Sequence, residues 1–452
     1  MLRFLLPAAL ALAACAPLPQ SGTPTRAVIS DNTLPPVKSF ATPRPTPPAR
    51  ANRDIARDFL DLSFALESGR ELPHLTRFEG PITVRVSGNP PANLTADLNA
   101  LLTRLRTEAR IDIRLTNSTE ANITVAAVTR REIRRTLPQA ACFVVPNIAS
   151  LREYKAARRS GAANWATLEK RERIAIFVPN DTTPQETRDC LHEELAQALG
   201  PLNDLYRLPD SVFNDDDVHA VLTGFDMTIL RAYYDPALRN GMTRDQVAAR
   251  LPAILTRINP RGDRLSPQFL PSTPRAWIDA VQTALGPGTS PEGRRRAATK
   301  ALNIAQQEGW TDHRLGFTHY ALGRLLANSD VNAAHTHFIY ADQVFARYPA
   351  YGPHRAYIAA LLSAHAIASG RGQEALNFTA PYLKTAAQHE NAVLLSTLML
   401  LQAEALDLEG RLEEAGALRL DSLGWARYGF GPDWAVREKL REISALSPLK
   451  GS

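Results

Sequence analysis

The chain has 452 residues, of which 44% are hydrophobic and 22% are charged, proportions typical of a soluble globular protein. This composition excludes a polytopic membrane protein and a chain that is disordered throughout. Three cysteines exclude a disulfide-knitted mini-fold and a cysteine-rich zinc array. The length predicts two or three domains. Because the net charge is only +6 and the basic residues are spread along the chain, we expect no nucleic-acid partner.

The first 14 residues have the pattern of a lipoprotein signal peptide. Arg3 precedes an apolar run that is too short to cross a bilayer. Residues 12–15, Leu-Ala-Ala-Cys, resemble the bacterial lipobox, in which the cysteine is acylated and becomes the first mature residue. The alternative is an ordinary secretory signal that is cleaved elsewhere. The resemblance implies a lipid anchor on Cys15 in the cell envelope, and Ala16 after it favours the outer membrane facing the periplasm.

The predicted location in the cell envelope guides the interpretation of residues 15–50 and of the two other cysteines. The segment 15–50 is rich in proline and poor in periodic apolar residues, which predicts an extended, lipidated tether. In an oxidising compartment Cys142 and Cys190 are most economically paired in a disulfide, the alternative being two separate buried thiols. Closing that loop would stabilise the fold by about 4 kcal/mol in the chain-entropy model.

Residues 52–260 are expected to form an α+β domain. Helices are predicted near residues 53–67 and over 94–105. Thr183 and Pro184 start a third helix, residues 184–199, and Gly200 is expected to end it in the left-handed conformation. Alternating or continuous apolar runs predict strands at residues 82–86, 111–115, 123–125, 141–145 and 174–178. This order of elements predicts a mixed sheet with helices packed on it.

The third helix carries a register similar to that of the metzincin clan of zinc peptidases. The motif of that clan is HExxHxxGxxH, in which the outer residues bind zinc and the glutamate is the general base. Glu194 and Gly200 match the motif, whereas Glu193, Gln197 and Asn203 stand at the three ligand positions. The chain also resembles a family of uncharacterised proteobacterial putative lipoproteins with the same Glu-Glu-x-x-Gln helix.

A second feature follows in the order that the clan would have it. Residues 211–215, Ser-Val-Phe-Asn-Asp, resemble the Met-turn, with Ser211 retained, Phe213 in place of methionine and Asp215 in place of tyrosine. A capped helix is predicted next, over residues 225–234, similar to the helix that closes metzincin domains. The resemblance covers about a third of the chain and implies a metzincin-like fold with a cleft above the 184–199 helix.

The ligand positions decide which chemistry the resemblance implies. Zinc requires three good donors, and the amides of Gln197 and Asn203 are poor ones. The sequence therefore favours a zinc-free pseudo-peptidase without a cofactor, in which Glu194 is vestigial. One alternative is a metal-dependent hydrolase with Glu194 as general base and atypical ligands. Another is a calcium-like cation at the oxygen-rich residues Glu193, Glu194, Asn203, Asp204 and 215–217.

Simpler interpretations of this helix remain open. In one of them, residues 193–203 are the end of an ordinary amphipathic helix, and the metzincin spacing arises by chance. His192 and His219 are the nearby imidazoles, and we expect them to be surface or packed residues. The residue one turn after His192 is Ala196, so these histidines do not form an HExxH site.

After a linker and helix at residues 261–287, residues 288–446 are expected to be helical throughout. Gly370-Arg-Gly-Gln-Glu-Ala recurs forty residues later as Gly410-Arg-Leu-Glu-Glu-Ala, which indicates an internal repeat of a tetratricopeptide-like kind. Stacked helix pairs commonly present a binding surface. The chain is therefore expected to be an anchored lipoprotein that binds a protein or envelope component through its cleft or its repeats. A lipoprotein that only scaffolds a complex is the third possibility.

Overall fold

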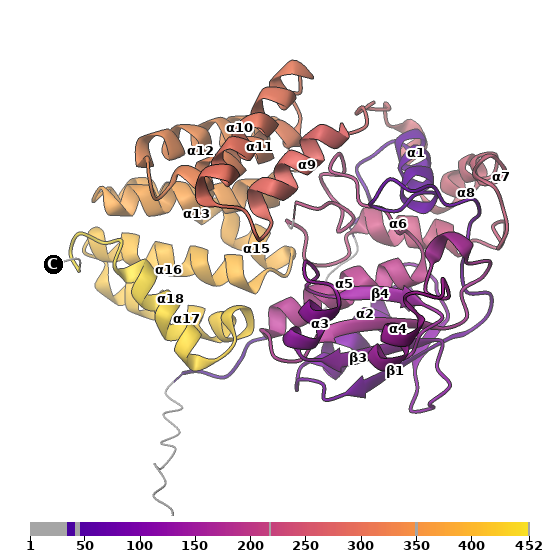
Figure 1. Ribbon diagram of the computed structural model, residues 1–452. Helices are drawn as coiled ribbons and strands as arrows, with labels where there is room; N and C mark the ends of the chain where they lie inside the picture. The colour runs from indigo at the N-terminus through magenta and orange to yellow at the C-terminus, as the bar shows by residue number, and fades with distance from the viewer. Residues whose placement is uncertain (1–33, 41–45, 217, 349–350, 451–452) are drawn as a thin grey trace, which may run out of the picture. The chain divides into compact units, whose positions relative to one another are not determined.

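In the computed structural model, an α+β region with a five-stranded mixed sheet is followed by a helical C-terminal region (Figure 1). The structure describes residues 34–40, 46–216, 218–348 and 351–450. The predicted signal peptide and acylated Cys15 lie outside these residues. Among the residues described, no helix is both long and apolar enough to span a bilayer.

The sheet has one antiparallel edge. Its strands, in the order β2-β1-β3-β5-β4, are parallel except for β4, which pairs antiparallel with β5. The mixed sheet and all five strands confirm the prediction, with shifts of a few residues at their ends. The strands are β1 (Ile82–Gly88), β2 (Ile113–Leu115), β3 (Ile123–Val128), β4 (Phe143–Pro146) and β5 (Ile174–Pro179).

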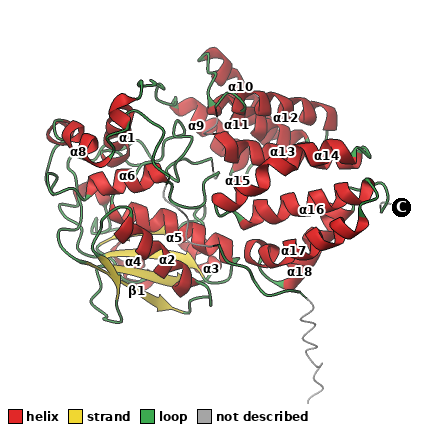
Figure 2. Cartoon of the chain, turned by 180° about the vertical axis from the view of Figure 1, so that it is seen from behind, coloured by secondary structure: helices red, strands yellow, loops and turns green. Residues whose placement is uncertain are grey.

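Helices cover both faces of this sheet. Helices α2 (Leu94–Thr107) and α5 (Pro184–Leu199) pack on one face, and α3 (Arg130–Thr136) and α4 (Leu151–Ala157) pack on the other. Alternate residues of β5 therefore enter two different cores, Ile176 with α5 and Phe177 with α3 and α4. Burial on both faces explains the unbroken apolar run of β5. Figure 2 shows the yellow strands beside the red helices α5, α2 and α4.

The remaining helices of the first region frame the end of α5. They are α1 (Asn52–Ser63), α6 (Gly224–Tyr233), α7 (Arg244–Ala248) and α8 (Leu251–Ile258). The predicted helix over 53–67 ends earlier, at Ser63. Residues 243–259 form two helices instead of one, because α7 ends before Ala249 and Pro252 lies in the first turn of α8. Proline suits a first turn because it lacks the N–H that an interior position would use.

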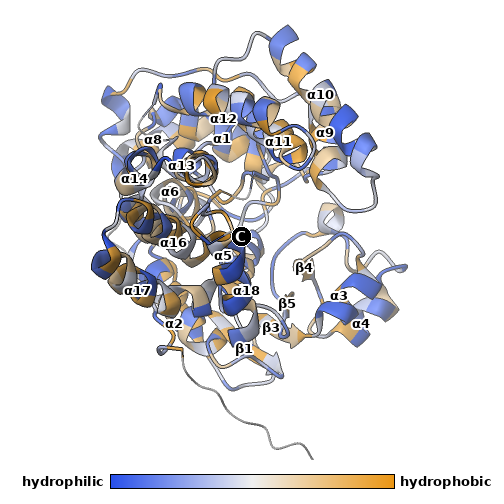
Figure 3. Ribbon diagram, turned by 90° about the vertical axis from the view of Figure 1, so that its left-hand side faces the viewer, coloured by the Kyte–Doolittle hydropathy of each residue, from blue (hydrophilic) through white to orange (hydrophobic). Residues whose placement is uncertain are grey.

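The C-terminal region is helical in the residues described, as predicted. Helices such as α10 and α17 carry both polar residues, drawn in blue, and apolar residues, drawn in orange (Figure 3). The sequence repeat corresponds to two helix pairs, α13–α14 and α16–α17. A glycine with a positive φ joins the helices of each pair: Gly370 (+71°) in the first and Gly410 (+75°) in the second. Short α15 lies between them. The helices are α9 (Arg275–Leu285), α10 (Pro291–Gln307), α11 (His313–Leu326), α12 (Val331–Phe345), α13 (Gly352–Ala368), α14 (Gly372–Thr379), α15 (Leu383–Gln388), α16 (Ala392–Leu408), α17 (Leu412–Phe430) and α18 (Asp433–Ser444).

Residues 35–40 pack against α17, which differs from the expectation of a free tether up to residue 50. The backbone N–H of Lys38 donates to the carbonyl of Gly424 at 3.1 Å. The Phe40 ring stacks on Trp425 with 4.6 Å between ring centres. Composition did not reveal this contact, because a few apolar and basic side chains suffice when a helix supplies the matching surface.

Candidate functional site

Helix α5, which packs against β4 and β5, carries Glu193, Glu194 and Gln197, the residues that were compared with the zinc-peptidase motif. Thr183 caps the helix by accepting a hydrogen bond from the N–H of Glu186 at 3.1 Å, and Pro184 is the first helical residue, as predicted. Glu193 and Gln197 are one turn apart and share a face, whereas Glu194 points about 100° away from Glu193. Glu194 is buried, with 4% of its surface exposed.

The end of α5 is fixed by glycine and by a buried arginine. The left-handed conformation expected for Gly200 is wrong, since its φ is −161°. Glycine instead leaves room for the ring of Tyr233, because a Cβ atom at this position would lie 3.0 Å from that ring, a tight contact. Arg171 is buried and donates to the carbonyls of Gln197, Ala198 and Gly200 at the end of the helix. A cation at this position is stabilised by the helix dipole.

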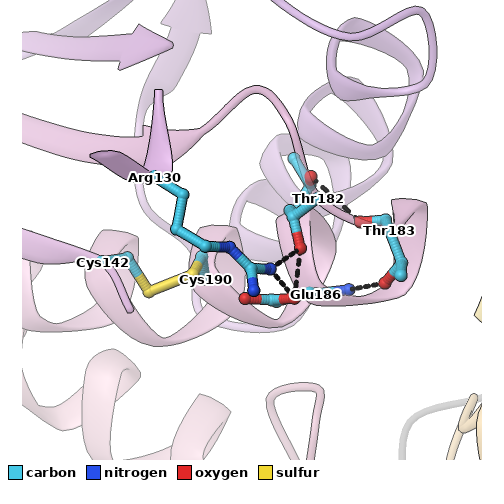
Figure 4. The surroundings of a disulfide bond; sticks show 7 residues. Arg130, Cys142, Thr182, Thr183, Glu186 and Cys190 are labelled. Carbon is cyan, nitrogen blue, oxygen red and sulfur yellow. Dashed lines mark hydrogen bonds and ion pairs between the residues drawn. A yellow bond between two sulfur atoms is a disulfide. The ribbon is translucent and has the colours of Figure 1, made fainter. Parts of the chain in front are cut away.

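The disulfide predicted from the sequence lies beside this register. Cys142, just before β4, is bonded to Cys190 in α5, with 5.9 Å between their Cα atoms (Figure 4). Near the start of α5, the guanidinium of Arg130 pairs with Glu186 at 2.6 Å. The segment before β4 is thereby fastened to the helix that carries Glu193 and Glu194.

A cleft of about 730 Å³ opens above α5. Glu193, Glu194 and Gln197 form its floor, and the segment 137–144, which leads into β4, forms one wall. The other walls come from residues 66–68, Leu202, Asp215 and Gln282. The structure therefore brings Glu193, Glu194, Gln197 and Asp215 together. Sequence reasoning missed Glu67 and Gln282, because no local pattern marks a loop and a distant helix as neighbours of α5.

Several carboxyl groups in and beside this cleft are buried, and their pKa values are raised. Burial raises the pKa of Glu194 well above its ordinary value, and the charges of Glu193 and Glu67 raise it further. The pKa values of Asp215, in the cleft, and of Asp204, which lines a neighbouring cavity, are raised in the same way, first by burial and then by Glu67. Oε2 of Glu194 and Oδ1 of Asp204 are buried without a hydrogen-bond partner. These carboxyl groups therefore bind protons more readily in the folded chain than in the unfolded chain, and a bound cationic group would stabilise their charged form.

The side chains present do not fit a zinc site. Asn203 does not join Glu193 and Gln197, because its Nδ2 donates to the carbonyl of Asp61 at 2.9 Å and it lines a different cavity. The cleft then offers one carboxylate and one neutral amide at the ligand positions, fewer good donors than zinc requires. In the described ranges, no three histidine, cysteine, aspartate or glutamate side chains are placed to hold a metal ion.

In the turn at residues 211–215, Ser211 and Phe213 are buried and support the fold, whereas Asp215 lines the cleft. Ser211 Oγ donates to Asp226 Oδ1 at 2.5 Å, and the N–H of Phe213 donates to Ser211 at 3.0 Å. Phe213 is fully buried. Asp226 also caps α6, and burial raises its pKa to about 6. Asp215 is the residue of this turn that reaches the cleft.

The histidines nearest the register are packed residues. His192 is 2% exposed, and its Nδ1 accepts the N–H of Leu222 at 3.1 Å. Burial, followed by Arg188 and Arg104, lowers its pKa well below 6.5. His192 therefore serves as a neutral acceptor, which confirms the expectation of a packed residue.

Asp216 and His219 belong to a separate cluster of buried histidines instead of the cleft. His354 Nε2 donates to Asp216 Oδ2 at 3.0 Å, and both side chains are buried. The rings of His219 and His354 are 6.0 Å apart, and His389 lies 5.2 Å from His219. His313 lies 6.0 Å from His354. Asp217 of the acidic run lies outside the described residues. Among the described members of the proposed cation set, Glu193, Glu194 and Asp215 line the cleft, whereas Asn203 and Asp204 line a different cavity.

Comparison with known proteins gives one match. Residues 52–253 match a family described as "Protein of unknown function (DUF2927)", a range that contains the sheet, α5 and the turn at Ser211. Searches of curated proteins and of solved structures find no match to the chain. The first region is thus similar to a family of unknown function, and the helical region lies beyond the matched range.

Proposed function

We propose that this chain is a non-catalytic binding protein of the cell envelope, whose cleft has the layout of a zinc-peptidase site without the ligands. The orientation of Asn203 carries the proposal, because its side chain is bonded to the carbonyl of Asp61, away from Glu193 and Gln197. The mixed sheet with one antiparallel edge, and the order of α5, the turn and α6, support a distant metzincin relation. Paired helices of similar geometry support a tetratricopeptide-like character for the C-terminal region.

The carboxyl groups of the cleft indicate which ligand it would hold. Glu67, Glu193, Glu194 and Asp215 line the same cavity. A basic group entering it would neutralise carboxylates that otherwise repel one another, which makes a lysine- or arginine-bearing segment of a protein the best matched ligand. Substrate hydrolysis by Glu194 would in addition require an activated water, for which these side chains offer no competent metal site.

Metal analysis combined with peptide assays tests this proposal. We expect the chain, purified without chelators, to contain much less than one zinc per molecule and to hydrolyse a fluorogenic peptide library no faster than Glu194→Gln does. A fluorescein-labelled pentalysine peptide should bind the wild type at least about tenfold more tightly than a Glu193→Gln, Asp215→Asn variant, a difference of about 1.4 kcal/mol. Glu172→Gln removes an exposed carboxylate outside the cleft and should bind as the wild type does.

Two results would overturn the proposal. Stoichiometric zinc together with hydrolysis that Glu194→Gln abolishes would establish the metal-dependent hydrolase instead. Equal pentalysine affinity in the cleft variant and in Glu172→Gln would show that the cleft does not select basic ligands.

The lipid anchor is a separate part of the proposal and rests on residues 12–15. Acyl chains on Cys15 would bind the chain stably to a membrane, since each buried methylene contributes about 0.8 kcal/mol. Cys15→Ser is expected to move the protein from the membrane fraction of bacterial cells to the soluble fraction. Mass spectrometry of the wild-type N-terminal peptide should show the acyl mass. A Cys15→Ser protein that stays in the membrane fraction after a high-salt wash contradicts this prediction.

A further inference from the structure

A second cavity, of about 820 Å³, lies among the helices of the C-terminal region. Its volume is in the range of small-molecule sites. Helices α10 and α11 contribute Arg294, Arg295 and Arg324 to its lining, and Phe317 and Phe345 contribute buried aromatic surface. The cavity lining thus combines cationic and apolar side chains.

The three arginines have no carboxylate partner among the ion pairs of the residues described. Nη2 of Arg294 donates to the carbonyls of Leu285 and Gly286, while its Nε is buried without a partner. The guanidinium of Arg324 lies 5.4 Å from the centre of the Tyr320 ring. The neighbouring Arg296, by contrast, is paired with Glu292 and does not line the cavity. Three arginines thus line a cavity that also contains two aspartates, one of which is paired with His354, so the lining carries a positive net charge that attracts an anion.

The cavity lining also contains acidic residues. Asp216, which is paired with His354, and Asp215 both line it, and Asp215 also lines the cleft above α5. An anionic group is repelled by these aspartates and attracted to the arginines. A ligand with an apolar body would place that body against Phe317 and Phe345, where burial of apolar surface stabilises it.

We propose that this cavity binds an amphipathic anion, with a carboxylate or phosphate group held by Arg295 and Arg324 and an apolar body against Phe317 and Phe345. Arg294 adds positive charge while it holds the end of α9. The site shares Asp215 with the cleft above α5, but its arginines select a ligand of the opposite charge.

Binding of 8-anilinonaphthalene-1-sulfonate, an aromatic anion, tests the site in the full chain. We expect the affinity measured by fluorescence titration to fall at least about tenfold in an Arg295→Gln, Arg324→Gln variant, a loss equivalent to about 1.4 kcal/mol. Arg296→Gln, which removes the ion-paired neighbour on the same helix, is the matched control and should bind as the wild type does. Far-ultraviolet circular dichroism and thermal unfolding show whether each variant is folded.

Competition then distinguishes the sources of the anion. Dodecyl phosphate represents a lipid-like ligand and N-acetyl-Leu-Phe represents a peptide carboxylate, with N-acetyl-Leu-Phe amide as its neutral control. We expect at least one anion to displace the dye from the wild type, and the amide to displace it less. Equal dye affinity in the double variant and Arg296→Gln, or equal displacement by the acid and its amide without displacement by dodecyl phosphate, would overturn the proposal.

Discussion

Replacing Cys142 and Cys190 with alanine is expected to lower the free energy of unfolding by about 4 kcal/mol. The disulfide closes a loop with a sequence separation of 48, and opening it returns that conformational freedom to the unfolded chain. For a folded unit of this size the corresponding fall in Tm is about 5 °C. Urea unfolding and calorimetry measure both quantities.

Dithiothreitol provides the control for this prediction. It should lower the stability of the wild type to that of the double variant and leave the variant unchanged. Hydrogen exchange should accelerate most in residues 137–146, which the disulfide fastens to α5 beside the cleft. Two reactive thiols in the denatured, unreduced wild type would contradict the prediction, because they would show that the disulfide does not form.

Acidification is expected to destabilise the fold through the buried histidine cluster. Burial lowers the pKa of His219 and His313 to about 4 and that of His389 to about 3. The unfolded chain, with an ordinary histidine pKa near 6.5, therefore binds these protons first. This contribution to stability is complete above about pH 6.5 and is lost as the pH falls toward 4, by about 3 kcal/mol for a single histidine with a folded pKa of 4.

The surroundings of the cluster explain why its protonation is unfavourable. His219, His354 and His389 repel one another's positive charge, and Arg50 and Arg314 add to that repulsion, while Asp216 and Asp312 oppose it. Protonation of Glu194, Asp204 and Asp215 acts in the other direction, because their folded pKa values are raised. The histidine contribution must therefore be isolated by substitution.

Comparison of two histidine variants isolates it. His389→Gln should reduce the slope of the unfolding free energy between pH 6.5 and 4 by about 1.4 kcal/mol per pH unit, which corresponds to one proton. The exposed His74 is the control, and His74→Gln should leave the slope unchanged. Identical slopes in His389→Gln and the wild type, measured by urea unfolding at each pH, would show that the cluster does not control acid stability.

The sequence predicted most of the first region because its signals are local. Helix α5 has a capping threonine, a proline at its start and a glycine after its end, and the five strands are short apolar runs. Helix α3 was overlooked, although Thr129 and Glu132 form the capping box that marks its start. The left-handed Gly200 was wrong because the demand on glycine there is tertiary, the space taken by the Tyr233 ring.

The sites were less predictable, because they join distant segments. His354 meets Asp216 across 138 residues of sequence, and Glu67 approaches α5 from a loop before the first strand. The orientation of Asn203 likewise depends on a carbonyl at the end of α1. A motif fixes the spacing of residues along one helix, whereas the partners of those residues depend on how the chain returns to that helix.

If Cys15 carries a lipid anchor, the contact of residues 35–40 with α17 limits how far the folded part can stand from the membrane. From Cys15 to Pro35 the chain advances 20 residues, which reach at most about 70 Å when fully extended. A tether ending at residue 50 would have allowed about 120 Å. Because the chain leaves the folded unit at α17, a lipid anchor on Cys15 would attach through the helical region.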